Sequence, residues 1–305
     1  MKWNFLFAFL ICSFALVINV CSIVVLYKTK TLNKTRFYFL VLLLSISDST
    51  ISIHYILHTV FNYMDDGSDT YLYGCMIFKQ AIGGTFGFSI FQILMICLER
   101  LHATFTSEIK ILRKLTSNTT VGLAFFMFPI FNIIPLIIEM QNGPHPCVVD
   151  YSARPLYVIS VDCPVILCLC LIISIYFVVI VRIVKKQRKV LDNTFAISIA
   201  QQNTLKRMKR NAVTLGIIIL VTSISFFPRE MIAIWVSLTG KTEGKLHLMI
   251  LGNHLTLINP LIDPIIYILR FKQIRDLLLC ACKSRTAPVT LINVRPIESS
   301  SILRF

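Results

Sequence analysis

Seven long apolar stretches constrain the fold of this chain more than any other feature of its sequence. A helix needs about 20 residues to cross the hydrocarbon core of a bilayer. Stretches of at least this length cover approximately residues 3–27, 37–63, 72–99, 121–141, 155–183, 211–238 and 246–269. Hydrophobic residues make up 56% of the chain, against roughly 45–50% in ordinary globular domains. We therefore predict an all-α membrane protein, a bundle of seven transmembrane helices.

The basic residues give this bundle an orientation. Four follow the first stretch, four the third and nine the fifth, and seven lie from Arg270 onward, which places 24 of the 30 Lys and Arg residues on one side. The positive-inside rule makes this side cytosolic. We expect a multi-pass plasma-membrane protein with its amino terminus outside and its carboxyl terminus in the cytosol. The basic loops that give the chain its net charge of +15 then lie against the anionic inner leaflet of the lipid bilayer. Because the lipid accounts for this charge, a nucleic-acid partner is not expected.

The domain organisation is simple, because the sequence shows no repeat and no soluble domain. Residues 1–282 are expected to form one membrane domain that includes a short amphipathic eighth helix over 271–279, and residues 283–305 a disordered tail. Cys280 and Cys282 follow the amphipathic stretch and are candidate palmitoylation sites. A cleaved signal peptide is the alternative for 3–27, but this stretch exceeds the 7–15 apolar residues typical of such peptides.

Asp263 and Pro264 place an acid and a helix-breaking residue inside the last apolar stretch. An acid at the centre of a membrane helix costs about 2.5 to 3.5 kcal/mol on insertion scales, and a proline inside a helix removes a backbone hydrogen bond. Such a pair makes sense if the helix must bend and the acid has a polar partner. It indicates a membrane switch more than a passive anchor.

Ordered motifs along nearly the whole chain resemble those of the rhodopsin-like G protein-coupled receptors. They are Asn19 in the first helix, Leu44-Ser45-Ile46-Ser47-Asp48 in the second, Cys75 and Cys147 as the disulfide pair, Glu99-Arg100-Leu101 in the third, Pro164 in the fifth, Phe226-Phe227-Pro228 in the sixth and Asp263 to Tyr267 in the seventh. Each motif is weak by itself, and together in seven segments they are strong.

The departures from the family pattern indicate a divergent member. Leu101 stands where a tyrosine is usual and Phe226 where a tryptophan is usual, and the fifth-helix tyrosine expected after Pro164 is missing. The start of the sixth helix has no acid to hold Arg100, so Glu99 is its only obvious restraint in the sequence. We therefore expect appreciable signalling without ligand.

The resemblance implies a function and a mechanism. The chain would be a receptor, not an enzyme, that binds an extracellular small molecule or short peptide and activates a heterotrimeric G protein by helix rearrangement. Serines 299–301 in the tail could serve a receptor kinase and arrestin. The residues expected to carry coupling and switching are Glu99, Arg100, Phe226, Pro228, Pro264 and Tyr267. A transporter or channel is the alternative, although these usually show two related halves, which we do not see.

Polar residues near the outer ends of the helices are the candidates for ligand binding. Ile82 stands where amine receptors carry an aspartate, and Leu257 stands where opsins carry the lysine that binds retinal. Biogenic amines and retinal are therefore both disfavoured as ligands. The expected ligand-binding residues are Tyr55, His58, Ile82, Phe86, Ser160, Arg229, Glu230 and Asn253. Arg229 and Glu230 either pair with each other or with Asp162, or Arg229 holds a charged group of the ligand through two hydrogen bonds.

A second polar group lies deeper in the predicted bundle. Asp48, Ser89, Asn259 and Asp263 resemble the family's sodium pocket, and oxygen ligands suit a hard cation. The alternative is that side chains and water satisfy the two acids without an ion. We expect no cofactor other than this possible allosteric sodium.

Overall fold

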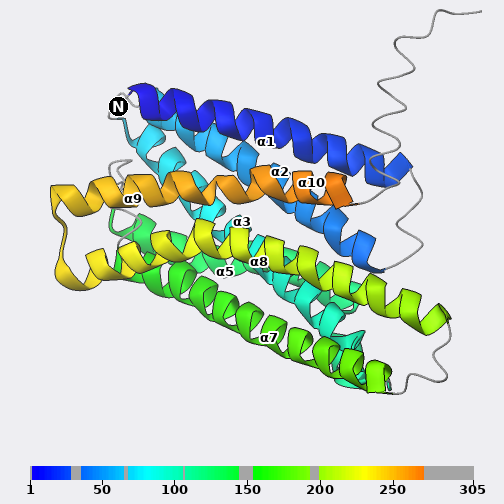
Figure 1. The fold of residues 1–305 in the computed structure, drawn as a ribbon. Coiled ribbons are helices and arrows are strands. Elements are labelled where there is room, and N and C mark those ends of the chain that lie inside the picture. Colours follow the sequence, from blue (N-terminus) through cyan, green and yellow to red (C-terminus); the bar gives the residue numbers. More distant parts are fainter. Residues whose placement is uncertain are drawn as a thin grey trace, which may run out of the picture.

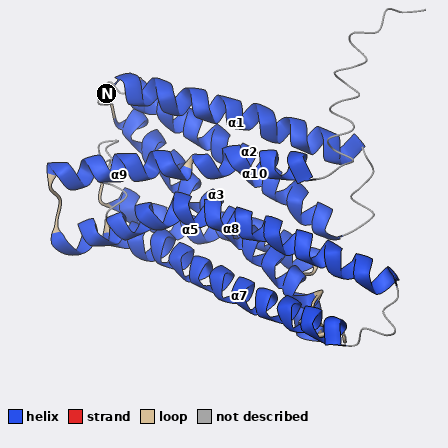
Figure 2. Ribbon diagram, in the orientation of Figure 1, coloured by secondary structure: helices blue, strands red, loops and turns tan. Residues whose placement is uncertain are grey.

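The computed structural model describes residues 2–28, 36–64, 68–105, 107–143, 154–192 and 199–270. The regular structure of these ranges is helical throughout (Figure 2). The expected eighth helix, Cys280, Cys282, the tail 283–305 and Cys147 lie outside the described residues. The predictions that concern them therefore stay predictions.

Seven of the helical units are long and apolar enough to cross a membrane. They are α1 (Lys2–Lys28), α2 (Arg36–Tyr63), α3 (Asp69–His102), α5 (Asn118–Gln141), the continuous unit of α6 (Pro155–Tyr157), the π-helical turn η3 (Val158–Asp162) and α7 (Cys163–Asp192), then α8 (Ile199–Thr239), and finally α9 (Glu243–Thr256) with α10 (Ile258–Arg270). A short helix, α4 (Lys110–Leu115), joins α3 to α5. The predicted seven-helix membrane bundle is confirmed.

The helix α3 forms the centre of the bundle (Figure 1). It contacts α2, α5, α7 and α8, and with 34 residues it is the longest helix after α8. At 1.5 Å per residue it spans about 51 Å. We call the end of the bundle at the α8–α9 connection the Gly240 end, and the opposite end, where α3 finishes, the Arg100 end.

The side chains that face away from the bundle are apolar. Phe126 and Phe131 in α5 and Leu167 and Phe177 in α7 are each more than 60% exposed. In water such a surface would invite aggregation, whereas in a bilayer the lipid tails cover it. The interior, in contrast, holds buried polar and charged residues such as Asp48, Arg229 and Asp263.

The last membrane unit is interrupted at Leu257, between α9 and α10, and not at Pro264 as the sequence suggested. Pro260 explains the position. A proline is tolerated in the first turn of a helix but not in its interior, so a new helix that begins at Ile258 accommodates Pro260. Pro264 lies inside α10, and it would deprive the carbonyl of Pro260 of its helical donor. The side-chain amide of Asn19 in α1 donates to this carbonyl at 2.7 Å.

Candidate functional site: a polar cavity, a buried acid pair and the Arg100 end

A cavity of about 110 Å³ opens among α2, α3, the continuous unit α6–η3–α7, α8 and α9, toward the Gly240 end. Polar and aromatic side chains dominate its wall. The lining residues are Tyr55, His58, Asn62, Lys79, Ile82, Gly83, Phe86, Tyr157, Val161, Val165, Phe226, Arg229, Glu230, Asn253 and Thr256. Ligand sites are typically concave, partly apolar and equipped with a few converging polar groups, and this cavity has these properties.

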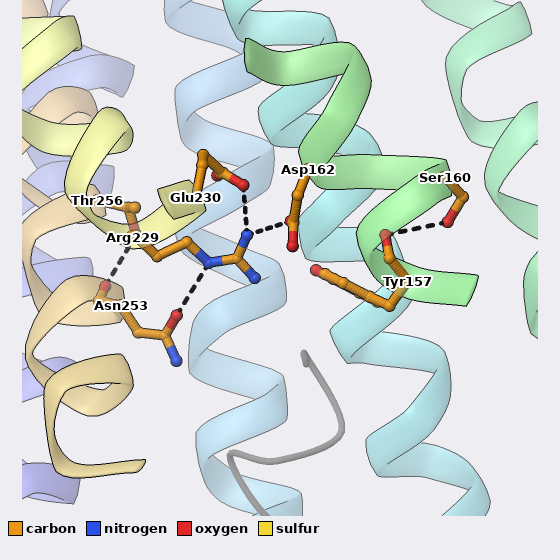
Figure 3. Close-up of polar contacts among 7 residues, drawn as sticks. All are labelled: Tyr157, Ser160, Asp162, Arg229, Glu230, Asn253 and Thr256. Atoms are coloured by element: carbon orange, nitrogen blue, oxygen red, sulfur yellow. Dashed lines mark hydrogen bonds and ion pairs between the residues drawn. The ribbon is translucent and has the colours of Figure 1, made fainter. Parts of the chain in front are cut away.

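Arg229 is the centre of a buried charged cluster on one wall of the cavity (Figure 3). Its Nη1 atom donates to a carboxylate oxygen of Asp162 and, at 2.7 Å, to Oε2 of Glu230. Its Nε atom donates to Oδ1 of Asn253 at 3.3 Å. Arg229, Asp162 and Glu230 are all buried. One guanidinium group therefore serves two carboxylates.

Local backbone features bring these groups together. The π-helical turn η3 ends at Asp162, and π-turns commonly occur at functional sites, where they change the direction of the side chains that follow. Gly252 in α9 lies against Arg229, because a Cβ atom at this position would be only 3.0 Å from the Arg229 Cα and Cβ atoms. The absence of a side chain at Gly252 lets α9 approach α8, and Asn253 then reaches the guanidinium.

The structure places seven of the eight predicted ligand-binding residues in the cavity wall. The exception is Ser160, which does not line the cavity and donates to the carbonyl oxygen of Tyr157 at 3.3 Å. Sequence reasoning missed Tyr157, Lys79 and Thr256. Tyr157 directly precedes the irregular η3 turn, so helical periodicity does not predict which way its side chain points. Lys79, in contrast, lies in the third turn of α3, and its charge there could have identified it as a cavity residue.

Aromatic rings form the floor of the cavity. The ring of Phe86 contacts Tyr55 with centroids 6.0 Å apart and Phe226 with centroids 5.0 Å apart, both edge to face. Phe226 is almost completely buried and stands in α8, shortly before Pro228. A ligand that presses on Phe86 would thus also press on the proline-containing part of α8.

The four residues of the predicted sodium site are buried together in the middle of the bundle. Ser89 donates to Oδ1 of Asp48 at 3.1 Å, and Asn259 donates to Oδ2 of Asp263 at 3.1 Å. Thr222 in α8 donates to Oδ1 of Asn259 at 2.9 Å. The second oxygen of each acid, Oδ2 of Asp48 and Oδ1 of Asp263, is buried without a hydrogen-bond partner among the described residues.

These unsatisfied oxygens fit a hard cation. A buried carboxylate oxygen without a donor costs free energy, and a small cation coordinated by carboxylate, hydroxyl and amide oxygens would remove this cost. Asp48, Ser89, Asn259 and Asp263 would hold such an ion. The acids belong to α2 and α10, which contact each other, so an ion there would link the two helices.

The Arg100 end carries the other predicted switch residues. Nε of Arg100 lies 3.3 Å from Oε2 of the neighbouring Glu99, and both side chains are about one-fifth exposed. Nearby, Arg182 of α7 donates to Oγ1 of Thr104 at 2.9 Å and lies 3.7 Å over the ring of Phe105. These two contacts of Arg182 connect α7 to the segment that follows α3.

Two further predictions involve residues or side chains that lie outside the described range. Cys75 is disulfide-bonded, but Cys147 lies outside the described range, so their pairing remains a prediction. Tyr267 belongs to α10, but its side chain also lies outside what the structure describes.

The structure is a seven-helix bundle with a polar cavity toward one end, a buried acid pair in its middle and the Glu99–Arg100 pair at the other end. The family model described as 7 transmembrane receptor (rhodopsin family) matches residues 18–267. The chain therefore belongs to the rhodopsin family of seven-transmembrane receptors. Comparison with curated proteins gives no match. Membership makes the chain a multi-pass plasma-membrane signalling receptor and not an enzyme, and it implies an extracellular ligand and a G protein as partners.

Proposed function

We propose that this receptor binds an extracellular small molecule or short peptide in the cavity at the Gly240 end and activates a heterotrimeric G protein at the Arg100 end. The observation that carries the proposal is that one helix, α3, contributes residues both to the cavity and to the Glu99–Arg100 pair. Ile82 and Phe86 of α3 line the cavity, and Glu99 and Arg100 lie near the other end of the same helix. The cavity volume of about 110 Å³ favours a small ligand, because drug-sized sites measure roughly 300–1,000 Å³.

The orientation follows from charge. The basic residues Lys185, Lys186, Arg188, Lys209 and Arg210 lie on α7 and α8 toward the Arg100 end and are exposed. Positive charge collects on the cytosolic side of membrane proteins, so the Arg100 end faces the cytosol and the amino terminus lies outside. The cavity is then open to extracellular ligands, and Arg100 is placed for a cytosolic partner.

Activation would proceed by population shift. A ligand that binds more tightly to one arrangement of α8, α9 and α10 raises the population of that arrangement. Phe226 lies between the cavity and the rest of α8, and Pro228 weakens the helix at the same level. Movement of α8 there would open the bundle beside Arg100. Receptor kinase and arrestin would act later, on the serines of the tail.

The test is a screen of small polar metabolites and short peptides for stimulated nucleotide exchange on a G protein panel. We expect a hit on the wild-type receptor that is lost in Phe86→Ala, because this change removes the ring between the cavity and Phe226. Leu123→Ala, on the exposed face of α5, is the control and should keep the response. A stimulated response that persists in Phe86→Ala would contradict the cavity as the ligand site.

A further inference from the structure

We propose that the ligand carries a protonated amine, and that Glu230 is the residue that pairs with it. This inference rests on the proposed function, because it names the ligand class of the same cavity. Its first support is charge. Asp162 and Glu230 share the single guanidinium of Arg229, so the cluster has one formal negative charge more than positive. No other ion pair reaches either acid among the described residues.

The hydrogen bonds of Arg229 argue against an anionic ligand held by this residue. A ligand carboxylate binds arginine best through two parallel N–H groups. Here Nη1 already serves Asp162 and Glu230, and Nε serves Asn253. Among the described contacts Nη2 is left over, but a carboxylate bound through two parallel N–H groups also needs Nε or Nη1 and would therefore compete with the buried amide or acids. The two-hydrogen-bond role considered for Arg229 from the sequence is therefore disfavoured.

The cavity exposes only one of the two acids. Glu230 lines it, together with Arg229, whereas Asp162 does not. One carboxylate oxygen of Asp162 is buried without a hydrogen-bond partner among the described residues, so the present contacts do not satisfy the pair of acids fully. An ammonium group at Glu230 would balance the formal charge of the cluster. Two buried carboxylates that share one guanidinium are costly, so a cationic group at Glu230 gains affinity here.

The remaining wall fits an ammonium group with a small polar or apolar body. The rings of Tyr55, Phe86 and Tyr157 line the same cavity, and aromatic faces attract cations within about 6 Å. Lys79 also lines the cavity, near His58 on the α2–α3 side, so the cation would lie on the Glu230 side. The acid that α3 lacks at Ile82 would thus be supplied by α8 on the opposite wall.

A matched series of small probes tests the inference on the purified full-length receptor in lipid nanodiscs. Propylamine, β-alanine, 1-propanol and propionate have similar size and differ in charge. We expect propylamine and β-alanine to raise the unfolding temperature with increasing concentration, because binding to the folded state stabilises it. Propanol and propionate should have little effect. A larger shift with propionate or propanol, or no shift with either amine, would overturn the proposal.

Two variants locate the effect. Glu230→Gln keeps the shape of the side chain and should weaken the propylamine response at least tenfold. Glu243→Gln removes an acid that is 93% exposed at the start of α9 and should leave it unchanged. An equal response in Glu230→Gln and wild type would refute the role of Glu230. Should Glu230→Gln fail to fold, the wild-type probe series still decides the ligand class.

The outcome is separable from the proposed function. Nucleotide exchange by the wild-type receptor without any probe, compared with Arg100→Ala, reports on G protein activation and does not depend on the ligand class. Exchange above Arg100→Ala together with a propionate-selective stabilisation would leave the receptor function in place and reject the amine.

Discussion

The side-chain amide of Asn19 in α1 donates a 2.7 Å hydrogen bond to the carbonyl oxygen of Pro260 in α10. This carbonyl needs an outside donor because Pro264, four residues later in the helix, has no N–H group. Both Asn19 and Pro260 are fully or almost fully buried. The asparagine therefore completes the hydrogen bonding of a proline-containing helix and attaches α1 to it.

Asn19→Leu should destabilise the receptor by about 1 to 3 kcal/mol, because it leaves the Pro260 carbonyl buried without a donor. The unfolding temperature in nanodiscs measures the loss. Ser13→Ala is the matched control, since Ser13 only donates to its own helix, at the carbonyl of Phe9. Adding Pro264→Ala to Asn19→Leu restores a backbone N–H and should recover part of the loss. No recovery in the double variant would contradict this explanation.

Sodium should stabilise the wild-type receptor more than the same concentration of potassium. The buried oxygens Oδ2 of Asp48 and Oδ1 of Asp263 lack hydrogen-bond partners among the described residues, and a small hard cation suits them. Asp48→Asn should abolish the difference between the two salts, measured as a shift in unfolding temperature. Asp69→Asn, at the exposed start of α3, should retain it. Equal shifts with both salts in the wild type would mean that side chains and water satisfy the acids.

Gly252→Ala should push α9 away from α8 and destabilise the receptor. Its Cβ atom would lie 3.0 Å from backbone and side-chain carbons of Arg229, and overpacking of this kind costs about 1 to 3 kcal/mol. Gly244→Ala lies in the same helix with open space around it and should be neutral or slightly stabilising. The unfolding temperatures of the two variants are the measurement. A loss of the same size in both would show that helix propensity, not the contact with Arg229, sets the effect.

Arg182→Ala should release α7 from the end of α3 and raise nucleotide exchange without ligand. Arg182 holds Thr104 by a 2.9 Å hydrogen bond and lies 3.7 Å over Phe105, contacts that stabilise by about 1 to 3 kcal/mol together. Lys185→Ala removes an exposed charge one turn further along α7 and serves as the control. Unchanged basal exchange in Arg182→Ala, at equal receptor amount, would show that this contact does not restrain the bundle.

The sequence predicted the membrane helices well, because length and apolarity determine them almost alone. It did not predict the interruption at Leu257. Pro264, beside an acid, suggested a bend there, whereas Pro260 is the proline that fits a new helix start at Ile258. Seven of the fifteen cavity-lining residues were also predicted as ligand-binding residues, from their depth along the helices. The η3 turn was not, because a π-turn has no simple periodic signal, and it is responsible for the errors at Ser160 and Tyr157.

The pairing of buried charges could not be predicted from the sequence either. Asp162 and Glu230 are 68 positions apart in the chain, and only the approach of η3 to α8 makes them share Arg229. From the sequence, Arg229 could equally hold a ligand or an internal acid. The close approach at Gly252 is likewise a property of packing, because an isolated glycine in a helix has no local signature of its neighbour.

The most direct test of the central claim is nucleotide exchange by the purified receptor in nanodiscs, without ligand, across all classes of heterotrimeric G protein. Glu99 is the neighbouring acid 3.3 Å from Arg100, and the part of α8 toward the Arg100 end carries Lys209 and Arg210 and has no acid in its sequence from Ile199 to Arg210. We expect the wild type to catalyse exchange on at least one class above the level of Arg100→Ala. Exchange that equals Arg100→Ala for every class, with both proteins folded, would contradict the proposed coupling.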